Sequence, residues 1–265
     1  MSTTFETMTL TEPEPGVALL TLNRPDRLNA ISRTMIDEFH AVLDLLQAHP
    51  SARVLVLTGA GRGFCAGTDL KQIAASGDAR PGVEAGFDGQ LKLSRIVSGL
   101  RRIPQPVIAA VNGVAAGGGL CFALAADVRV AAESARFIGS FINIGLSAGE
   151  IGSTYLLPRL IGVSRAAEIL YTGREVGAAE ADRIGLVSRV VPDGEAVGAA
   201  LEIARTMLGK SAFGLRMTKE VLDLNVDAPS LEAALQLENR TQQLAVRTDA
   251  FVASVEAFAL RRRPA

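Results

Sequence analysis

The sequence is poor in the residues that many catalytic and structural sites require. Its 265 residues include only two cysteines, Cys65 and Cys121, and two histidines, His40 and His49. Two cysteines exclude a disulfide framework and are typical of a protein kept in a reducing cytoplasm. The cysteines are far apart, the histidines are not adjacent, and no paired-carboxylate motif occurs, so the sequence predicts no metal site.

The net charge is close to zero, and the sequence shows neither a secretory signal nor an uninterrupted long apolar run. The formal net charge is -1, so we expect neither a nucleic acid nor a membrane as a partner. The first ten residues lack the basic region and apolar core of a secretory signal. Residues 103–132 are strongly apolar, but two prolines, three successive glycines and the charges of Asp127 and Arg129 interrupt them. This stretch therefore predicts a buried strand, turn and helix rather than a membrane span.

Two glycine-rich stretches, residues 59–70 and 112–121, are the most informative features of the chain. Each follows a short apolar run, residues 53–58 and 106–111 respectively, which predicts a strand that enters a glycine-rich turn and then a helix. Glycine lets the backbone approach a ligand closely and lets N–H groups point outward. Two such turns side by side would direct two N–H donors at one oxygen, as in an oxyanion hole.

Other functions of these glycines are less well supported. Residues 61–66 fit the dinucleotide pattern G-x-G-x-x-A, but they follow an earlier strand and helix, and no P-loop pattern occurs anywhere. Residues 63–67 and 145–149 fit a nucleophile elbow with cysteine and serine respectively. That mechanism needs a histidine later in the chain, and both histidines come earlier. We therefore favour neither a nicotinamide enzyme nor a triad hydrolase.

Apolar periodicity predicts an α/β core over residues 1–200 and a helical arm over residues 201–265. Residues 74–90 have no clear period and are expected to be irregular. Strands are expected at 17–22, 53–58, 106–111, 128–131, 136–138 and 188–191. Helices are expected after Ser32 and at 91–100, 153–160, 164–171, 178–183, 195–208, 212–224, 231–245 and 249–262.

Five segments of the chain form a recognisable set: LNRPDRLNA (22–30), GFCAGTDL (63–70), VNGVAAGGG (111–119), YLLPRLIG (155–162) and TGREVGAAEADRIGLVSRVV (172–191). Together they resemble the crotonase, or enoyl-CoA hydratase/isomerase, superfamily over about residues 5–263. The resemblance implies an α/β fold with a ββα-superhelix core and a C-terminal helical oligomerisation arm, assembled as trimers or pairs of trimers. It also implies an acyl-CoA thioester as substrate, with coenzyme A as part of that substrate and no separate cofactor.

The resemblance also assigns roles to individual residues. The backbone N–H groups of Ala66 and Gly118 would form the oxyanion hole for the thioester enolate. Basic and apolar residues would bind coenzyme A, with Arg24 and Lys71 assisting Arg27 at its phosphates and the C-terminal residues covering it from a neighbouring subunit. The predicted coenzyme A contacts are Arg27, Ala30, Asp69, Leu70, Phe258 and Arg261.

The sequence departs from the family at the two glutamates that a hydratase uses. Their positions hold Cys121 and Phe141. Glu150 remains, in a loop where several family members, including double-bond isomerases, place a single acid. One carboxylate can remove a proton from one carbon and return it to another, so we predict a lyase or isomerase that transfers protons through Glu150.

Several alternatives stay open at this stage. Glu150 could instead cap the helix that begins near Ser153, and Glu84 or Asp88 could supply a second carboxylate. Asp127 is expected to make a local structural hydrogen bond. The chain could also be a non-catalytic acyl-CoA-binding member of the family, or a hydrolase of another acyl-CoA.

Overall fold

The structure is a computed structural model that describes residues 2–76 and 82–261; the side chains of residues 76, 260 and 261 are outside this description. The chain divides into two compact units, Met1–Ala204 and Arg205–Ala265. The division falls inside helix α8 (Ala196–Leu208), where the sequence analysis placed a boundary after residue 200. No helix in the described part of the chain is long and apolar enough to cross a membrane.

The larger sheet of the first unit has seven strands in the order β1-β2-β3-β4-β6-β8-β11. The first three strands pair antiparallel, and every pair from β3 to β11 is parallel. The central strands β4 and β6 are buried along their whole length, as expected for parallel strands covered on both faces. The strands are β1 (Thr3–Thr4), β2 (Met8–Glu14), β3 (Val17–Leu22), β4 (Val54–Gly59), β6 (Val107–Val111), β8 (Val128–Ala132) and β11 (Arg189–Val191).

The smaller sheet brings the two glycine-rich stretches together. Its order is β10-β9-β7-β5, from β5 (Gly63–Cys65), β7 (Val114–Ala116), β9 (Arg136–Ile138) and β10 (Glu175–Gly177). Strands β5 and β7 lie inside the two glycine-rich stretches and pair in parallel, Cys65 opposite Ala115. The two glycine-rich stretches therefore lie side by side, as an oxyanion hole formed by both would require. Each contains a short strand that the sequence analysis had assigned to the turn.

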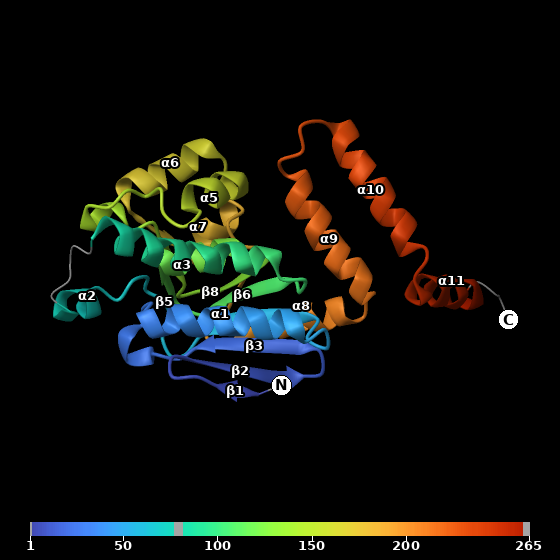
Figure 1. The fold of residues 1–265 in the computed structure, drawn as a ribbon, viewed down its shortest axis with the longest axis horizontal. Helices are drawn as coiled ribbons and strands as arrows, with labels where there is room; N and C mark the ends of the chain where they lie inside the picture. The colour runs from blue at the N-terminus through green and yellow to red at the C-terminus, as the bar shows by residue number, and fades with distance from the viewer. Residues whose placement is uncertain (1, 77–81, 262–265) are drawn as a thin grey trace. The chain divides into compact units, whose positions relative to one another are not determined.

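Helices α1 (Arg33–Ala48) and α3 (Val83–Arg102) pack against each other beside the larger sheet (Figure 1). The predicted cap of α1 is confirmed, because the Ser32 hydroxyl accepts a hydrogen bond from the Met35 N–H at 3.1 Å. Residues 83–90 are helical, and α2 covers Leu70–Ser76, so most of the stretch predicted to be irregular is helix. The buried face of α3 begins only at Leu93, and the apolar side chains of its first turns, Val83 and Phe87, are exposed.

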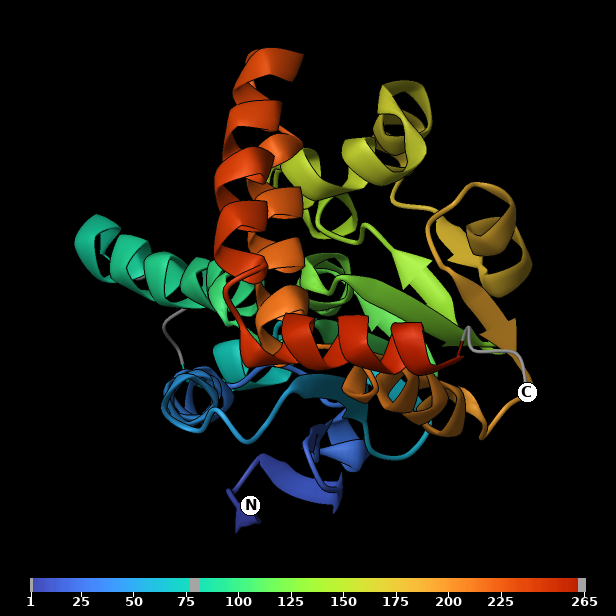
Figure 2. The ribbon, with the colours of Figure 1, turned by 90° about the vertical axis from the view of Figure 1, so that its right-hand side faces the viewer.

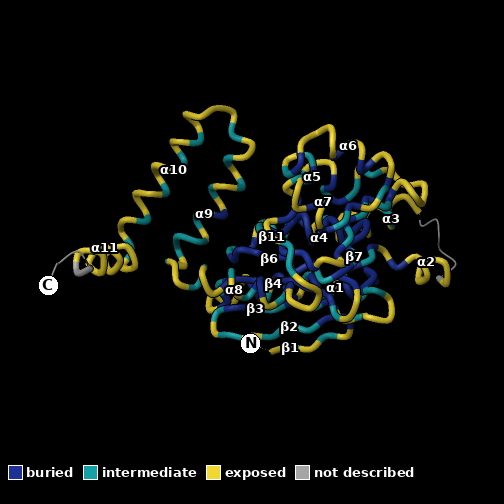
Figure 3. The backbone as a smooth tube through the Cα atoms, turned by 180° about the vertical axis from the view of Figure 1, so that it is seen from behind, coloured by how far each residue is buried: buried dark blue, intermediate teal, exposed yellow. Residues whose placement is uncertain are grey.

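Helix α4 (Gly118–Ala125) is buried along its entire length and contacts both α3 and α5 (Ser153–Ile161). Because it is apolar on every side, it forms the centre of the first unit, as the tube coloured by burial shows (Figure 3). The shorter helical segments around it are η1 (Pro25–Arg27), η2 (Ile142–Ile144), α6 (Val163–Thr172) and α7 (Ala178–Arg183).

The second unit is helical, as predicted. Helices α9 (Ala212–Asn225) and α10 (Leu231–Ala245) pack against each other (Figure 2), and α11 (Asp249–Arg261) ends the described chain. Ser211 and Ser230 cap the first two helices through their hydroxyl oxygens. Helix α10 and the described side chains of α11 include no buried residue. Large apolar side chains are exposed there, at Leu231, Leu235, Leu244, Phe251, Val252, Val255 and Phe258.

Candidate active site

Two asparagines hold the first glycine-rich turn. The Asn29 side chain donates to the carbonyls of Ala60 at 3.0 Å and Gly63 at 2.8 Å. The Asn112 side chain donates to the Gly61 carbonyl at 2.9 Å. Segments 22–30 and 111–119 therefore meet at this turn, which explains why each carries an asparagine. The buried Gly63 carbonyl, which would otherwise lose its hydrogen bond, is satisfied, and the turn is fixed by all three contacts.

The three glycines at the start of α4 differ in conformation, packing and hydrogen bonding. Gly117 has φ +51°, which favours glycine. A Cβ atom at Gly119 would lie 2.0 Å from the Cys65 carbonyl oxygen, so only glycine lets α4 pack this closely against β5. Gly118 is the first residue of α4, and its N–H has no hydrogen-bond partner among the described residues. This free donor lies at the positive end of a helix dipole.

The predicted second donor, Ala66, is not free. Its N–H donates to the Leu28 carbonyl at 2.9 Å, because residues 28–31 run alongside the end of the glycine turn. A donor that is already paired with a backbone carbonyl cannot bind a substrate oxygen without breaking that bond. The assignment of Ala66 to the oxyanion hole is therefore corrected.

Thr68 has the geometry that Ala66 lacks. The Ile31 N–H donates to the Gly67 carbonyl at 2.8 Å, and the Asp69 N–H donates to the Ile31 carbonyl at 3.0 Å. Thr68 lies between these two bonds, so its own N–H points away from Ile31, and it has no partner in the described part of the chain. A Cβ atom at Gly67 would lie 3.3 Å from the Gly118 nitrogen. The segment that carries Thr68 thus adjoins the other free donor.

Asp69 fixes the next part of this segment. It accepts hydrogen bonds from Arg24 at 2.9 Å and from the Gln72 N–H at 3.0 Å, and Arg24 also donates to the Ala30 carbonyl. Burial raises the pKa of Asp69, but the hydrogen bonds and the charges of Arg24 and Arg27 outweigh this effect, so its pKa lies below the usual range. Asp69 and Arg24 are therefore engaged with each other, and Arg24 is not a free phosphate contact.

The other predicted coenzyme A contacts are divided between the two units. In the first unit, Arg27 and Lys71 are exposed, Leu70 is 48% exposed, and Ala30 is buried. Phe258 is exposed on α11 in the second unit. The side chain of Arg261 lies outside the described residues.

The backbone of Glu150 is anchored next to α4. Its carbonyl accepts from the Ser153 N–H at 2.9 Å and from the Cys121 thiol at 3.6 Å. Ile151 follows with φ +30°, an uncommon backbone conformation for a β-branched residue. The Ile151 side chain lies 3.5 Å from where a Cβ atom at Gly118 would stand. These contacts place Glu150 beside the helix end that carries the free N–H.

The carboxylate of Glu150 does not cap α5. The N-cap residue of α5 is Gly152, and no side chain caps that helix. The Glu150 Oε1 atom instead accepts a hydrogen bond from the side-chain amide of Gln90 on α3. Sequence reasoning missed Gln90, because residues 74–90 were expected to be irregular. The apolar i, i+4, i+8 spacing of Val83, Phe87 and Leu91 is the signal that could have found this part of the helix.

Cys121 and Phe141, to which the family resemblance assigns the positions of the hydratase glutamates, are both buried. Burial raises the pKa of Cys65 to about 12 and raises the pKa of Cys121 as well. Both thiols stay protonated at neutral pH, so neither is a nucleophile.

The remaining acids have other surroundings. Glu84 and Asp88 are exposed on the first turns of α3. Asp127 accepts from the Val107 N–H at 2.7 Å and pairs with Arg101 at 3.5 Å, so its predicted structural role is confirmed. Among the described residues, no three His, Cys, Asp or Glu side chains are grouped as metal ligands.

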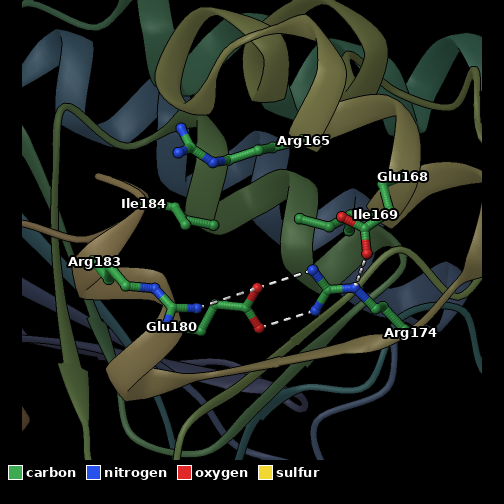
Figure 4. A pocket seen from close by; sticks show the side chains of 7 residues that line it. All are labelled: Arg165, Glu168, Ile169, Arg174, Glu180, Arg183 and Ile184. Atoms are coloured by element: carbon green, nitrogen blue, oxygen red, sulfur yellow. Dashed lines mark hydrogen bonds and ion pairs between the residues drawn. The ribbon is translucent and has the colours of Figure 1, made fainter.

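A separate pocket of about 230 Å³ lies between α6 and α7 (Figure 4). Arg174 crosses it, donating to Glu168 at 2.7 Å and to both carboxylate oxygens of Glu180 at 2.8 and 2.9 Å. Hydrogen bonds to Glu180 and Glu168 raise the pKa of Arg174 far above its usual range. This pocket contains none of the predicted site residues, and its ion pairs join α6 to α7. It is lined by Arg165, Glu168, Ile169, Arg174, Glu180, Arg183 and Ile184.

Comparison with known proteins agrees with the geometry. A family model described as enoyl-CoA hydratase/isomerase matches residues 12–265. A probable enoyl-CoA hydratase of Mycobacterium bovis is 48% identical over 95% of this chain and 90% of its own length. A 1,2-epoxyphenylacetyl-CoA isomerase of Escherichia coli is 37% identical over 96% of both chains. A solved structure of a monofunctional enoyl CoA isomerase from M. smegmatis is 46% identical, with a TM-score of 0.74, over 88% of this chain and 99% of its own.

Proposed function

This chain belongs to the enoyl-CoA hydratase/isomerase family and is an acyl-CoA-processing enzyme of that type, and we propose that it catalyses double-bond isomerisation through one carboxylate, Glu150. The observation that carries this proposal is the position of Glu150. Its backbone is anchored beside the α4 end that carries the free N–H of Gly118, and the family resemblance assigns the positions of the two hydratase glutamates to buried Cys121 and Phe141. Two relatives with this overall similarity are named as isomerases.

The oxyanion hole would consist of the N–H groups of Thr68 and Gly118. Both donors lack partners in the described part of the chain, and both are held by backbone contacts. They would bind the thioester carbonyl oxygen and stabilise the negative charge that develops there when a neighbouring C–H bond breaks. The partial positive charge at the start of α4 would add to this stabilisation.

Glu150 would transfer the proton in two steps. Its carboxylate would take a proton from C2 of a 3-enoyl thioester, leaving a dienolate whose oxygen is bound in the hole. The same group would return a proton to C4, giving the 2-enoyl thioester. The substrate neither gains nor loses atoms, so no second carboxylate, added water or separate cofactor is needed.

Coenzyme A would lie beside the exposed Arg27 and Leu70. Arg27 would pair with its phosphates, and Ala30 and Asp69 would shape the backbone that contacts it. The exposed apolar side chains of α10 and α11 support an arm that is covered by other subunits in a trimer or a pair of trimers. In that assembly, Phe258 and Arg261 would close over coenzyme A. The free, protonated cysteines are consistent with a cytoplasmic protein.

The test is turnover of a short 3-enoyl-CoA and its 2-enoyl isomer in heavy water, with wild type beside Glu150→Gln. Wild type should interconvert the isomers and incorporate deuterium. The variant should lose about 10²- to 10⁴-fold in rate at an unchanged melting temperature. Binding without exchange in wild type would contradict the proposal and favour an acyl-CoA-binding protein. Hydrated product in wild type would identify a hydratase, and free coenzyme A would identify a hydrolase.

A further inference from the structure

The Glu150 carboxylate has one hydrogen-bond partner among the described residues, and it comes from another helix. The Gln90 side-chain amide on α3 donates to Glu150 Oε1. From this contact we propose that Gln90 is a positioning residue that orients the Glu150 carboxylate for proton transfer. This inference rests on the proposed role of Glu150 as the acid and base.

The loop around Glu150 does not orient the carboxylate by itself. Residues 142–147 and 149 are exposed, and the contacts from Cys121 and Ser153 hold only the backbone of Glu150. A glutamate side chain rotates about three torsions beyond its backbone, and it loses that freedom only when its end is held. Gln90 supplies that contact in this structure.

Helix α3 is suited to act as the support. Its C-terminal half is anchored in the core by Leu93, Ile96, Val97 and Leu100. The Val97 side chain lies 3.5 Å from where a Cβ atom at Gly152 would stand, next to the loop that carries Glu150. Gln90 and Val97 are seven residues apart and therefore share one face of the helix. The same helix face thus contacts the loop just after Glu150 and the carboxylate itself.

The chemistry of the contact also favours this role. An amide donor on Oε1 holds the carboxylate by one oxygen and leaves Oε2 to exchange protons with the substrate. Gln90 is neutral, so it does this without pairing the carboxylate with a cation. A carboxylate with a salt-bridge partner would be a weaker base.

The experiment compares Gln90→Leu and Gln90→Glu with wild type, by measuring deuterium exchange into 3-enoyl-CoA as a function of pH. Gln90→Leu keeps a similar size but removes the donor. It should lower kcat about 10-fold, which is the scale of one lost hydrogen bond to a charged group, with KM within about twofold. Loss of the donor to the carboxylate should also move the acid limb of the kcat/KM profile to higher pH.

Gln90→Glu places a second carboxylate against Glu150. Repulsion between the two charges should move the acid limb to still higher pH than in Gln90→Leu. The matched control is Gln47→Leu, an exposed glutamine on α1, which should leave rate and profile unchanged. Melting temperatures verify that each variant is folded.

The outcomes separate the two proposals. If Glu150→Gln abolishes exchange while both Gln90 variants keep the wild-type rate and pH profile, the role of Gln90 is overturned and the proposed function stands. If both variants lose rate without any shift of the acid limb, Gln90 serves only to support the fold, and the inference is also overturned. If Glu150→Gln exchanges at the wild-type rate, the proposed function itself fails.

Discussion

The two halves of the candidate site are built in different ways. The oxyanion donors, Thr68 and Gly118, belong to backbone that is held by a sheet, a buried helix and two asparagine side chains. Glu150 belongs to an exposed loop, and its carboxylate depends on one side chain, that of Gln90. The oxyanion donors are therefore positioned by packed backbone, whereas the Glu150 carboxylate is positioned by a side chain.

This difference bears on which part of the site selects the reaction. Residues that hold the oxyanion donors cannot change without disturbing packed backbone, so this half suits any reaction that passes through a thioester enolate. Glu150 lies in a loop in which residues 142–147 and 149 are exposed, so a change of this acid should disturb the packed core little. The loop and α3 would therefore decide which reaction follows.

The largest effect is expected at Gly119, where α4 packs against β5 in the half of the site that holds the oxyanion donors. A Cβ atom there would lie 2.0 Å from the Cys65 carbonyl, so Gly119→Ala must shift α4 away from β5. It should cost about 3 kcal/mol or more of unfolding free energy and reduce exchange activity through the displaced Gly118 N–H. Urea denaturation measures the loss. The matched control is Gly89→Ala on α3, where nothing lies within 4 Å; it should raise stability by up to about 1 kcal/mol. Equal stabilities of the two variants would contradict the packing argument.

A smaller effect is expected at Asp69, which fixes the segment next to Thr68. Asp69→Asn removes a charged hydrogen-bond partner from Arg24 and should cost about 1.5–3 kcal/mol at pH 7. Because the pKa of Asp69 is lowered in the folded state, its contribution is present at neutral pH and is lost as the pH falls below about 4.

The stabilities of wild type and Asp69→Asn should therefore converge in acid. Denaturation of both proteins between pH 7 and pH 3 checks this expectation. Asp26→Asn, at an exposed position in η1, is the control and should show no such difference. A constant gap between wild type and Asp69→Asn over this pH range would show that the carboxylate charge does not matter.

The smallest effect is expected from the two acids of α3, Glu84 and Asp88, which are not part of the proposed mechanism. Glu84 and Asp88 are exposed on α3, and neither contacts the Glu150 loop in any described interaction. The double variant Glu84→Gln/Asp88→Asn should keep kcat and KM for 3-enoyl-CoA within about twofold, since surface substitutions of this kind are close to neutral. A loss of 10-fold or more would identify a second carboxylate and return hydration to consideration.

Much of the fold was predictable from local patterns. The strand at 17–22, the Ser32 cap and the helices of the second half follow from period and capping, because these signals lie within a few residues. Strands β5 and β7 were not predicted, because three-residue strands among glycines have no period of their own. The first turns of α3 were not predicted, because residues 74–90 have no clear period and were expected to be irregular.

Part of the candidate site was also predictable from the sequence. The sequence alone determined the family and the two glycine-rich stretches, and it predicted the missing hydratase glutamates and the candidate acid Glu150, because each depends on which residue stands at a position. Only the tertiary structure decided which N–H groups are free. The Ala66 donor is used by Leu28, whereas Thr68 faces the other way, and this depends on strand pairing between segments far apart in the chain. The contact between Gln90 and Glu150, 60 residues apart, likewise exists only once α3 and the loop are packed together.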